Sequence, residues 1–499
     1  MLAALLATSM HRTGHTQGDD FALYLRQARS LFDGDIGAVV ADNRFSVLNS
    51  DSAFSPIAYP WVWPLLLSPF VHLWGLDYDR LKLVEVGVMC VWLVMLHGIV
   101  RRRIGRVPAL AVVAVFATAP AYLVHTDQLL SEFPHLAAVA IFIWWYDRIR
   151  SRSSLIEAST NELVVLGALV TLTFNVRRES VVLLVVIAVM QIYDVLDERV
   201  DVMGTIRQSW RTIITPYAAF AVSATLAQLL LPTALLPDNG NKASFLDDRL
   251  GEYPAILSEQ LGLGVHPLVG IVILVVAGVG AVVGVRKRPT LDGPLALVAL
   301  LSALAISTHL RKVDRYWFQI TPWVVYFAAV ACVAAANFAA DRLTSPSRDH
   351  QSEPITHSFT RWVGILAVSP LLVVVAIHLA VLPGRVNEAD DYNDAGRVQS
   401  GPSNPTVTPI YDAVNELTPP DAIIAFYRAR TMTLLTDRLS FQTKNLDTIA
   451  ANADYFAQRR DSTYWQPRLS TAEARAAGWE EVWSDPRWIL WRIPETGDP

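Results

Sequence analysis

The stretch Asp19-Asp20-Phe21-Ala22-Leu23-Tyr24-Leu25-Arg26-Gln27-Ala28 places two adjacent carboxylates directly after a short apolar N-terminus. Apolar runs of membrane-spanning length follow it and recur up to about Leu382. Because a carboxylate is costly to hold at the rim of a bilayer, this acidic pair indicates chemistry at the boundary between water and lipid. A structural role is compatible with that interpretation, since Asp20 is also placed to act as the N-cap of a helix over Phe21–Phe32.

The composition is that of a membrane protein. Hydrophobic residues make up 53% of the 499 residues and charged residues only 17%, whereas soluble domains carry roughly 25% charged residues. The net charge of -5 provides no basic surface for nucleic acid. The two cysteines, Cys90 and Cys332, both lie in apolar runs and exclude a disulfide framework. Met1–Met10 lacks the basic segment of a signal peptide, so we expect a shortened first helix or a start within one.

The basic residues indicate how the chain crosses the membrane. Arginines and lysines gather in alternate loops, such as Arg101–Arg103 and Arg286–Arg288, so simple alternation places these loops on one, inner, face. We therefore expect a mainly α, polytopic bundle of about 11 spans in the cell (inner or plasma) membrane. Besides the Leu2–Met10 remnant, the expected spans are 81–100, 107–125, 133–147, 162–176, 179–193, 212–231, 266–285, 292–308, 316–340 and 362–382.

The composition divides the chain into two domains, because after about Leu382 it becomes that of a soluble domain. Residues 1–383 form the expected transmembrane domain, with a first outer loop at 13–80, and residues 384–499 form a small soluble α/β domain on the extracytoplasmic side. In that second domain Ala422–Tyr427 is typical of a buried strand and Thr448–Arg460 of a helix. A closing hairpin is expected to turn at Asp485-Pro486.

Some basic residues fall on the expected outer face, although basic residues usually gather on the inner face, and their position therefore needs an explanation. Arg177 and Arg178 lie between two apolar helices, and Lys312 and Arg315 lie at another outer junction. Arginine binds phosphate with a planar fork, and a low-dielectric rim strengthens that contact. The alternatives are structural, because Arg177, Arg178 and Arg315 could also be interfacial anchors. The acidic residues on this face are Asp19, Asp20, Asp127 and Glu132.

The motifs on this outer face resemble those of the GT-C glycosyltransferases, closest to protein O-mannosyltransferases and lipid A aminoarabinose transferases. Asp20, Tyr24 and Ala28 are similar to the opening of that family's first outer loop, although Phe21 stands where a second acid is common. The other resembling segments are Tyr59–Pro69, Thr126–Pro134, Asn175–Glu179 with Arg178 in place of a proline, and Arg315-Tyr316 with Pro322.

The resemblance implies a glycosyltransferase that uses a polyprenyl-phosphate sugar and inverts the anomeric carbon. It implies Asp20 as the general base, with Asp19 as the alternative, and the lipid phosphate held by Arg177, Arg178, Lys312 and Arg315. The implied supporting or acceptor-binding residues are Tyr24, Tyr59, Asp127, Glu132, Glu179 and His309. No cofactor is certain, and a divalent cation on Asp19, Asp127 and Glu132 stays an open alternative. The implied partners are the donor, membrane lipids and a glycan, lipid or protein acceptor, but no nucleic acid.

Two other functions fit parts of the pattern. A transporter or flippase would also hold intramembrane charges, but usually near the middle of the bilayer and with two similar halves. A glycan polymerase or ligase that uses lipid diphosphates would share the outer arginines and a long outer loop, here 232–267. The gathering of charges at one rim favours the glycosyltransferase.

Overall fold

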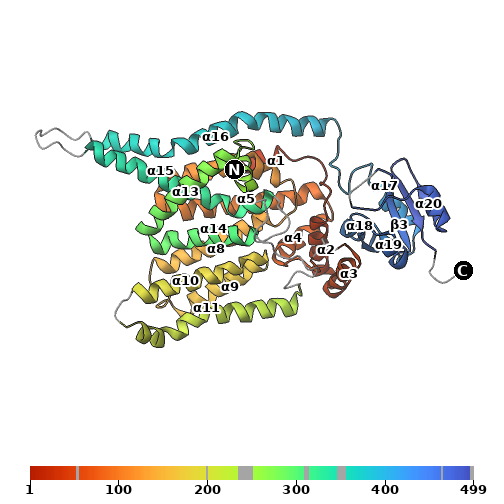
Figure 1. The fold of residues 1–499 in the computed structure, drawn as a ribbon, viewed down its shortest axis with the longest axis horizontal. Coiled ribbons are helices and arrows are strands. Elements are labelled where there is room, and N and C mark those ends of the chain that lie inside the picture. Colours follow the sequence, from red (N-terminus) through yellow and green to blue (C-terminus); the bar gives the residue numbers. More distant parts are fainter. Residues whose placement is uncertain are drawn as a thin grey trace, which may run out of the picture.

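A computed structural model of the chain describes residues 1–51, 56–197, 201–233, 251–307, 314–344, 356–461 and 465–494. A helical bundle occupies one part of the elongated molecule and a small sheet domain the other, with three N-terminal helices between them (Figure 1). The helices of the first part are α1 (Leu2–Thr8), α2 (Asp20–Asp33), α3 (Ile36–Asn49), α4 (Val62–Trp74), α5 (Tyr78–Ile104), α6 (Arg106–Thr118), α7 (Pro120–His125), α8 (Glu132–Arg150), α9 (Thr160–Phe174), η1 (Arg178–Val181), α10 (Val182–Asp197), α11 (Val202–Leu230), α12 (Tyr253–Gln260), α13 (Pro267–Lys287), α14 (Pro289–Ser307), η3 (Asp314–Gln319), α15 (Thr321–Thr344) and α16 (Thr356–Asp394).

The helices confirm a polytopic membrane bundle. Within the described residues, seven are long and apolar enough to cross a bilayer: α5, α10 with η1, α11, α13, α14, α15 and α16. Shorter apolar helices are α4, α6 and α9. Large apolar side chains point outward, including Leu229 on α11 and Val272 on α13, each well over half exposed. Such side chains are stable on an outer surface when the surrounding solvent is lipid.

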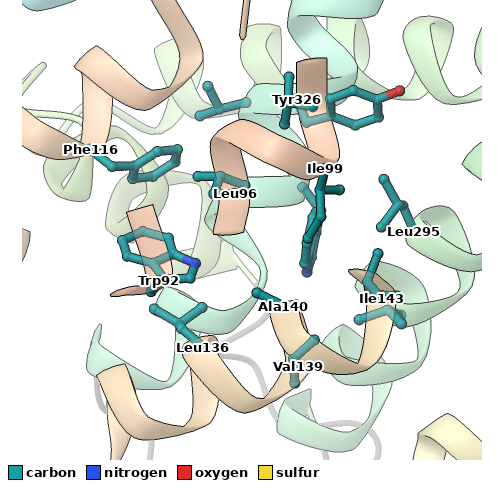
Figure 2. Packing of buried hydrophobic residues seen from close by; sticks show 14 of the residues in the cluster. Trp92, Leu96, Ile99, Phe116, Leu136, Val139, Ala140, Ile143, Leu295 and Tyr326 are labelled. Carbon is teal, nitrogen blue, oxygen red and sulfur yellow. The ribbon is translucent and has the colours of Figure 1, made fainter. Parts of the chain in front are cut away.

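Helices α5 and α8 form the centre of the bundle. Trp92, Leu96 and Ile99 of α5 pack with Leu136 and Ile143 of α8, and all are buried (Figure 2). Phe116 of α6, Leu295 of α14 and Tyr326 of α15 close the cluster from other sides. Because this core is continuous across five helices, it fixes the positions of the helix ends, where the charged motifs lie.

A buried charge network joins four helices at the end of the bundle away from the sheet domain. Arg103 donates to both carboxylate oxygens of Asp147, at 2.6 and 2.7 Å, and its Nε lies 3.4 Å from Asp292 Oδ1. Tyr326 donates to the same Asp292 oxygen at 2.6 Å. The side chains of Arg103, Asp147 and Asp292 are at most 1% exposed. This network locks α5, α8, α14 and α15 together.

Loss of the Arg103 guanidinium should destabilise the bundle strongly. Arg103→Met leaves the buried Asp147 carboxylate without its ion-pair partner, whereas Asp292 keeps Arg288 at 2.8 Å. Breaking a buried pair in this way costs about 3–5 kcal/mol. We expect a clearly lower melting temperature for the detergent-purified variant, with Arg102→Met, an exposed neighbour, as the matched control. Equal melting temperatures for the two variants would show that the network contributes little.

The C-terminal part is a five-stranded mixed sheet with helices, which confirms the expected small α/β domain. Its strand order is β2-β1-β3-β5-β4, with β1 parallel to β2 and β3, and β5 antiparallel to β3 and β4. The strands are β1 (Ile423–Ala425), β2 (Leu439–Phe441), β3 (Tyr455–Arg459), β4 (Glu480–Ser484) and β5 (Trp488–Arg492). The helices are α17 (Thr408–Leu417), α18 (Ala429–Thr436), α19 (Leu446–Asn452) and α20 (Thr471–Ala476).

One local prediction in this domain is wrong. The expected helix over 448–460 is a short helix, α19, followed by the central strand β3. The N-cap of α19 is Asn445, whose side-chain oxygen accepts from the backbone N–H groups of Asp447 and Thr448. The helix ends at Asn452, and Asp454 accepts from the Ile423 backbone N–H at 2.8 Å. Tyr455 and Phe456 then pair between two strands, where aromatic residues are favoured.

Candidate functional site

A charged network lies at the end of the bundle that faces the sheet domain, and Asp20 is its most accessible acid. Tyr59 donates a hydrogen bond to Asp20 Oδ1 at 2.6 Å, and Arg315 Nη2 donates to Asp20 Oδ2 at 2.7 Å. The Asp20 side chain is 34% exposed and that of Arg315 24%. The N-cap of α2 is Asp19 rather than Asp20, and it makes no side-chain cap bond. The Asp20 carboxylate is therefore directed at Tyr59 and Arg315.

Glu132 connects Arg315 to Arg177. Its Oε1 accepts from Arg177 Nη1 at 3.0 Å and lies 3.5 Å from Arg315 Nε. Arg177 Nε in turn donates to Glu179 Oε1 at 2.6 Å. The result is an alternating chain, Asp20–Arg315–Glu132–Arg177–Glu179, whose members come from four separate segments of the sequence. Far-apart charges of the sequence thus meet in a single network.

Aromatic rings hold these charges in place. The guanidinium carbons of Arg177 and Arg315 lie 5.3 and 5.8 Å from the ring centroid of Tyr316. The rings of Tyr24 and Tyr59 pack 4.6 Å apart, and the Tyr24 hydroxyl donates to Ser131 at 3.2 Å. The Tyr316 ring therefore lies against both guanidinium groups, and the Tyr24–Tyr59 pair packs beside Asp20.

The sheet domain contributes a residue that the sequence did not indicate. Arg430 of α18 is only 5% exposed and donates to the Tyr59 hydroxyl at 3.2 Å. It also donates to Asn43 Oδ1 at 3.1 Å and to the Pro56 carbonyl at 2.8 Å. Arg430 thereby positions Tyr59, which positions Asp20. No local motif surrounds Arg430, and only the tertiary contact reveals it.

Other candidate residues lie outside this network. Asp19 is buried and accepts from Thr431 of the sheet domain, at 3.3 Å from the hydroxyl. Asp127 pairs with the buried Lys82 at 2.7 Å and accepts from Gln399 at 3.0 Å. Arg178 stacks on the Phe174 ring, 4.4 Å from its centroid. His309 and Lys312 lie outside the described residues.

The structure does not bring together the three acids considered for a cation. Asp19, Asp127 and Glu132 each have separate partners, namely Thr431, Lys82 and the arginine pair. Within the described part of the chain, no group of three or more His, Cys, Asp or Glu side chains is placed to hold a metal ion.

The surroundings of Asp20 keep it ionised. Burial alone raises the pKa of the Asp20 carboxyl, but the Arg315 charge and the Tyr59 hydrogen bond outweigh it, so that the pKa lies below its usual range. Burial and the nearby Asp20 charge raise the pKa of the Tyr59 hydroxyl well above its ordinary value. At neutral pH the site therefore holds an Asp20 carboxylate and a protonated Tyr59 that donates to it.

The fold matches solved structures along almost the whole chain. ArnT from Cupriavidus metallidurans bound to undecaprenyl phosphate aligns with a TM-score of 0.58 at 12% identity, over 99% of this chain and 97% of ArnT. The archaeal oligosaccharyltransferase AglB from Archaeoglobus fulgidus, in complex with an inhibitory peptide and a dolichol-phosphate, aligns with a TM-score of 0.51 at 10% identity, over 92% of this chain and 68% of AglB. These matches confirm the expected GT-C-like fold. No family model and no curated protein matches the sequence significantly.

Proposed function

We propose that this protein is a membrane glycosyltransferase that moves a sugar from a polyprenyl-phosphate donor to an acceptor hydroxyl at the outer face of the membrane. The observation that carries the proposal is the accessible Asp20–Arg315 ion pair, joined through Glu132 to Arg177. A base and two phosphate-binding arginines are the groups that this reaction requires. The chain shares its fold with ArnT bound to undecaprenyl phosphate and with AglB in complex with a dolichol-phosphate, which supports the same substrate class.

The chemical step follows from the placement of these groups. Asp20 accepts the proton of the acceptor hydroxyl as its oxygen attacks the anomeric carbon of the donor. The bond between that carbon and the phosphate oxygen breaks, and the polyprenyl phosphate departs with the electron pair. Arg315 and Arg177 stabilise the negative charge that develops on the phosphate. Attack opposite to the leaving group inverts the configuration of the sugar.

Donor binding and base strength are coupled through Arg315. Without a ligand this guanidinium neutralises Asp20, which weakens the carboxylate as a base. A donor phosphate competes for the same N–H groups, and its own negative charge lies close to Asp20. Both effects raise the pKa of Asp20, so the base becomes stronger when the donor is present.

The proposed function also implies how the chain is oriented in the membrane and which molecules it binds. The positively charged loops lie inside and the Asp20 network outside, together with the C-terminal α/β domain. Lys312, His309, Arg178 and Asp127 stay candidates for donor or acceptor contacts. The acceptor is a glycan, a lipid or a protein, and membrane lipids surround the bundle.

Incubation of the purified protein with lipid-linked sugars tests the function. The panel holds polyprenyl-monophosphate and polyprenyl-diphosphate donors that carry several sugars, and mass spectrometry identifies the lipid product. We expect release of polyprenyl phosphate from a monophosphate donor. Release of a diphosphate would instead indicate the polymerase or ligase type, and lipid movement in vesicles without any cleavage would indicate a flippase.

Removal of the Tyr59 hydroxyl should shift the pH dependence of transfer. The hydrogen bond from Tyr59 stabilises the Asp20 carboxylate and lowers its pKa, so Tyr59→Phe raises that pKa. Because the base must be ionised, the acidic limb of the kcat/KM profile is expected to move to higher pH. Arg430→Gln should move the acidic limb in the same direction. An unchanged profile in both variants would show that Arg430 and Tyr59 do not control the pKa of Asp20.

A further inference from the structure

A second pocket lies at the junction of the sheet domain and the first outer loop. Its walls include Gln17 of that loop, Asn404 of the segment before α17, and Arg459 and Arg487 from the ends of β3 and β5. Its cavity volume is about 330 Å³, and it opens to solvent. This volume falls in the range of small-ligand sites, which is about 300–1,000 Å³.

We propose that this junction pocket binds a negatively charged sugar unit of the acceptor. The inference rests on the proposed glycosyltransferase function and names the acceptor class for it. Arginines supply recognition of a carboxylate or phosphate, and amide and hydroxyl groups, such as Gln17 and Ser400, supply contacts for sugar hydroxyls.

The two arginines of the pocket have few partners in the described part of the chain. Among the described residues, the Arg487 guanidinium has no hydrogen-bond or ion-pair partner, and Arg459 has only Asp461, at 3.3 Å and 66% exposed. Asp485 uses its Oδ1 to accept from the backbone N–H groups of Arg487 and Trp488. Two guanidinium groups with spare donors therefore face an open cavity in a chain whose net charge is -5.

The pocket wall is preformed. The Asn404 side chain donates to the carbonyls of Val398 and Gln399 at 2.7 and 3.2 Å, and its oxygen accepts from the backbone and hydroxyl of Thr406. The Trp488 indole donates to the Thr406 carbonyl at 2.8 Å. Little ordering is then required when a ligand binds, which favours affinity.

The position of the pocket connects it to the candidate base. Gln17 precedes Asp20 by three residues, so their Cα atoms are at most about 11 Å apart. An acceptor with more than one sugar unit can therefore reach both the pocket and the Asp20 carboxylate.

Calorimetric titration of the purified full-length chain tests the binding step. The probes are glucuronate, glucose 6-phosphate, glucose and inorganic phosphate. We expect a charged sugar to bind at least tenfold more tightly than glucose or inorganic phosphate. Whether glucuronate or glucose 6-phosphate binds more tightly shows whether the pocket prefers a carboxylate or a phosphate. Arg459→Gln with Arg487→Gln should weaken that binding at least tenfold, whereas Arg475→Gln, exposed on α20 of the same domain, should leave it unchanged.

Binding that is equal for glucose and the charged sugars, or unaffected by the double variant, would overturn the inference. Kinetics separate it from the proposed function. In the double variant the KM for a charged acceptor should rise at least tenfold, while hydrolysis of the donor by water stays unchanged. An unchanged KM with active transfer refutes the acceptor pocket alone. If no donor releases polyprenyl phosphate but charged sugars still bind, the proposed transferase function is refuted and the pocket as a charged-sugar site is retained.

Discussion

Asp20→Asn is expected to lower the rate of sugar transfer by about a hundredfold or more, without unfolding the protein. A positioned general base contributes about 10²–10⁴-fold to such reactions, and an amide cannot accept the proton. The substitution keeps the shape of the side chain, and Asp20 is one-third exposed, so the helix around it should be preserved. Product formation under saturating donor measures the effect, and the melting temperature checks the fold.

Asp19→Asn is the matched control. Asp19 adjoins Asp20 in sequence but faces Thr431 of the sheet domain, and no ion pair joins it to Arg315 among the described contacts. We expect this variant to retain most of its transfer rate. Full activity in Asp20→Asn would remove the proposed base, and loss of activity in Asp19→Asn alone would assign the role to the neighbouring acid.

Arg315→Lys is expected to lower kcat/KM by about tenfold to a hundredfold. A hydrogen bond to a charged group is worth about 1.5–3 kcal/mol, and lysine keeps the charge of Arg315 but loses its planar fork. Arg315 contacts both Asp20 and Glu132, so its loss also leaves two acids less well paired. Steady-state kinetics with varied donor concentration measures the change.

Arg178→Gln provides the comparison for this arginine. Arg178 is the sequence neighbour of Arg177 but stacks on Phe174, and no ion pair joins it to the network among the described residues. A smaller effect than that of Arg315→Lys is expected. Equal, weak effects of the two substitutions would indicate that both arginines are interfacial anchors.

The sequence indicated the architecture because its signals are local. Apolar length and the alternation of basic loops predict helices and their direction, and these depend on each segment alone. The sequence also indicated Arg177 and Arg315, because the predicted topology places them on the outer face, whereas basic residues usually gather in cytoplasmic loops. The structure places both beside Glu132, close to Asp20.

What the sequence could not show depends on tertiary contacts. Asp127 and Glu132 are only five residues apart in the sequence, yet one pairs with Lys82 and the other with the arginines. Arg430 reaches Tyr59 across 371 residues. The helix expected over 448–460 failed because pairing with β1 and β5, rather than local preference, makes 455–459 a strand.

A cryo-electron microscopy map of the purified protein with added polyprenyl phosphate would locate the lipid headgroup. The phosphate should lie within hydrogen-bond distance of Arg315 and Arg177, with the Asp20 carboxylate beside it and released from its contact with Arg315. A headgroup bound away from these three side chains, for example near the basic loops at the other end of the bundle, would contradict the proposed site.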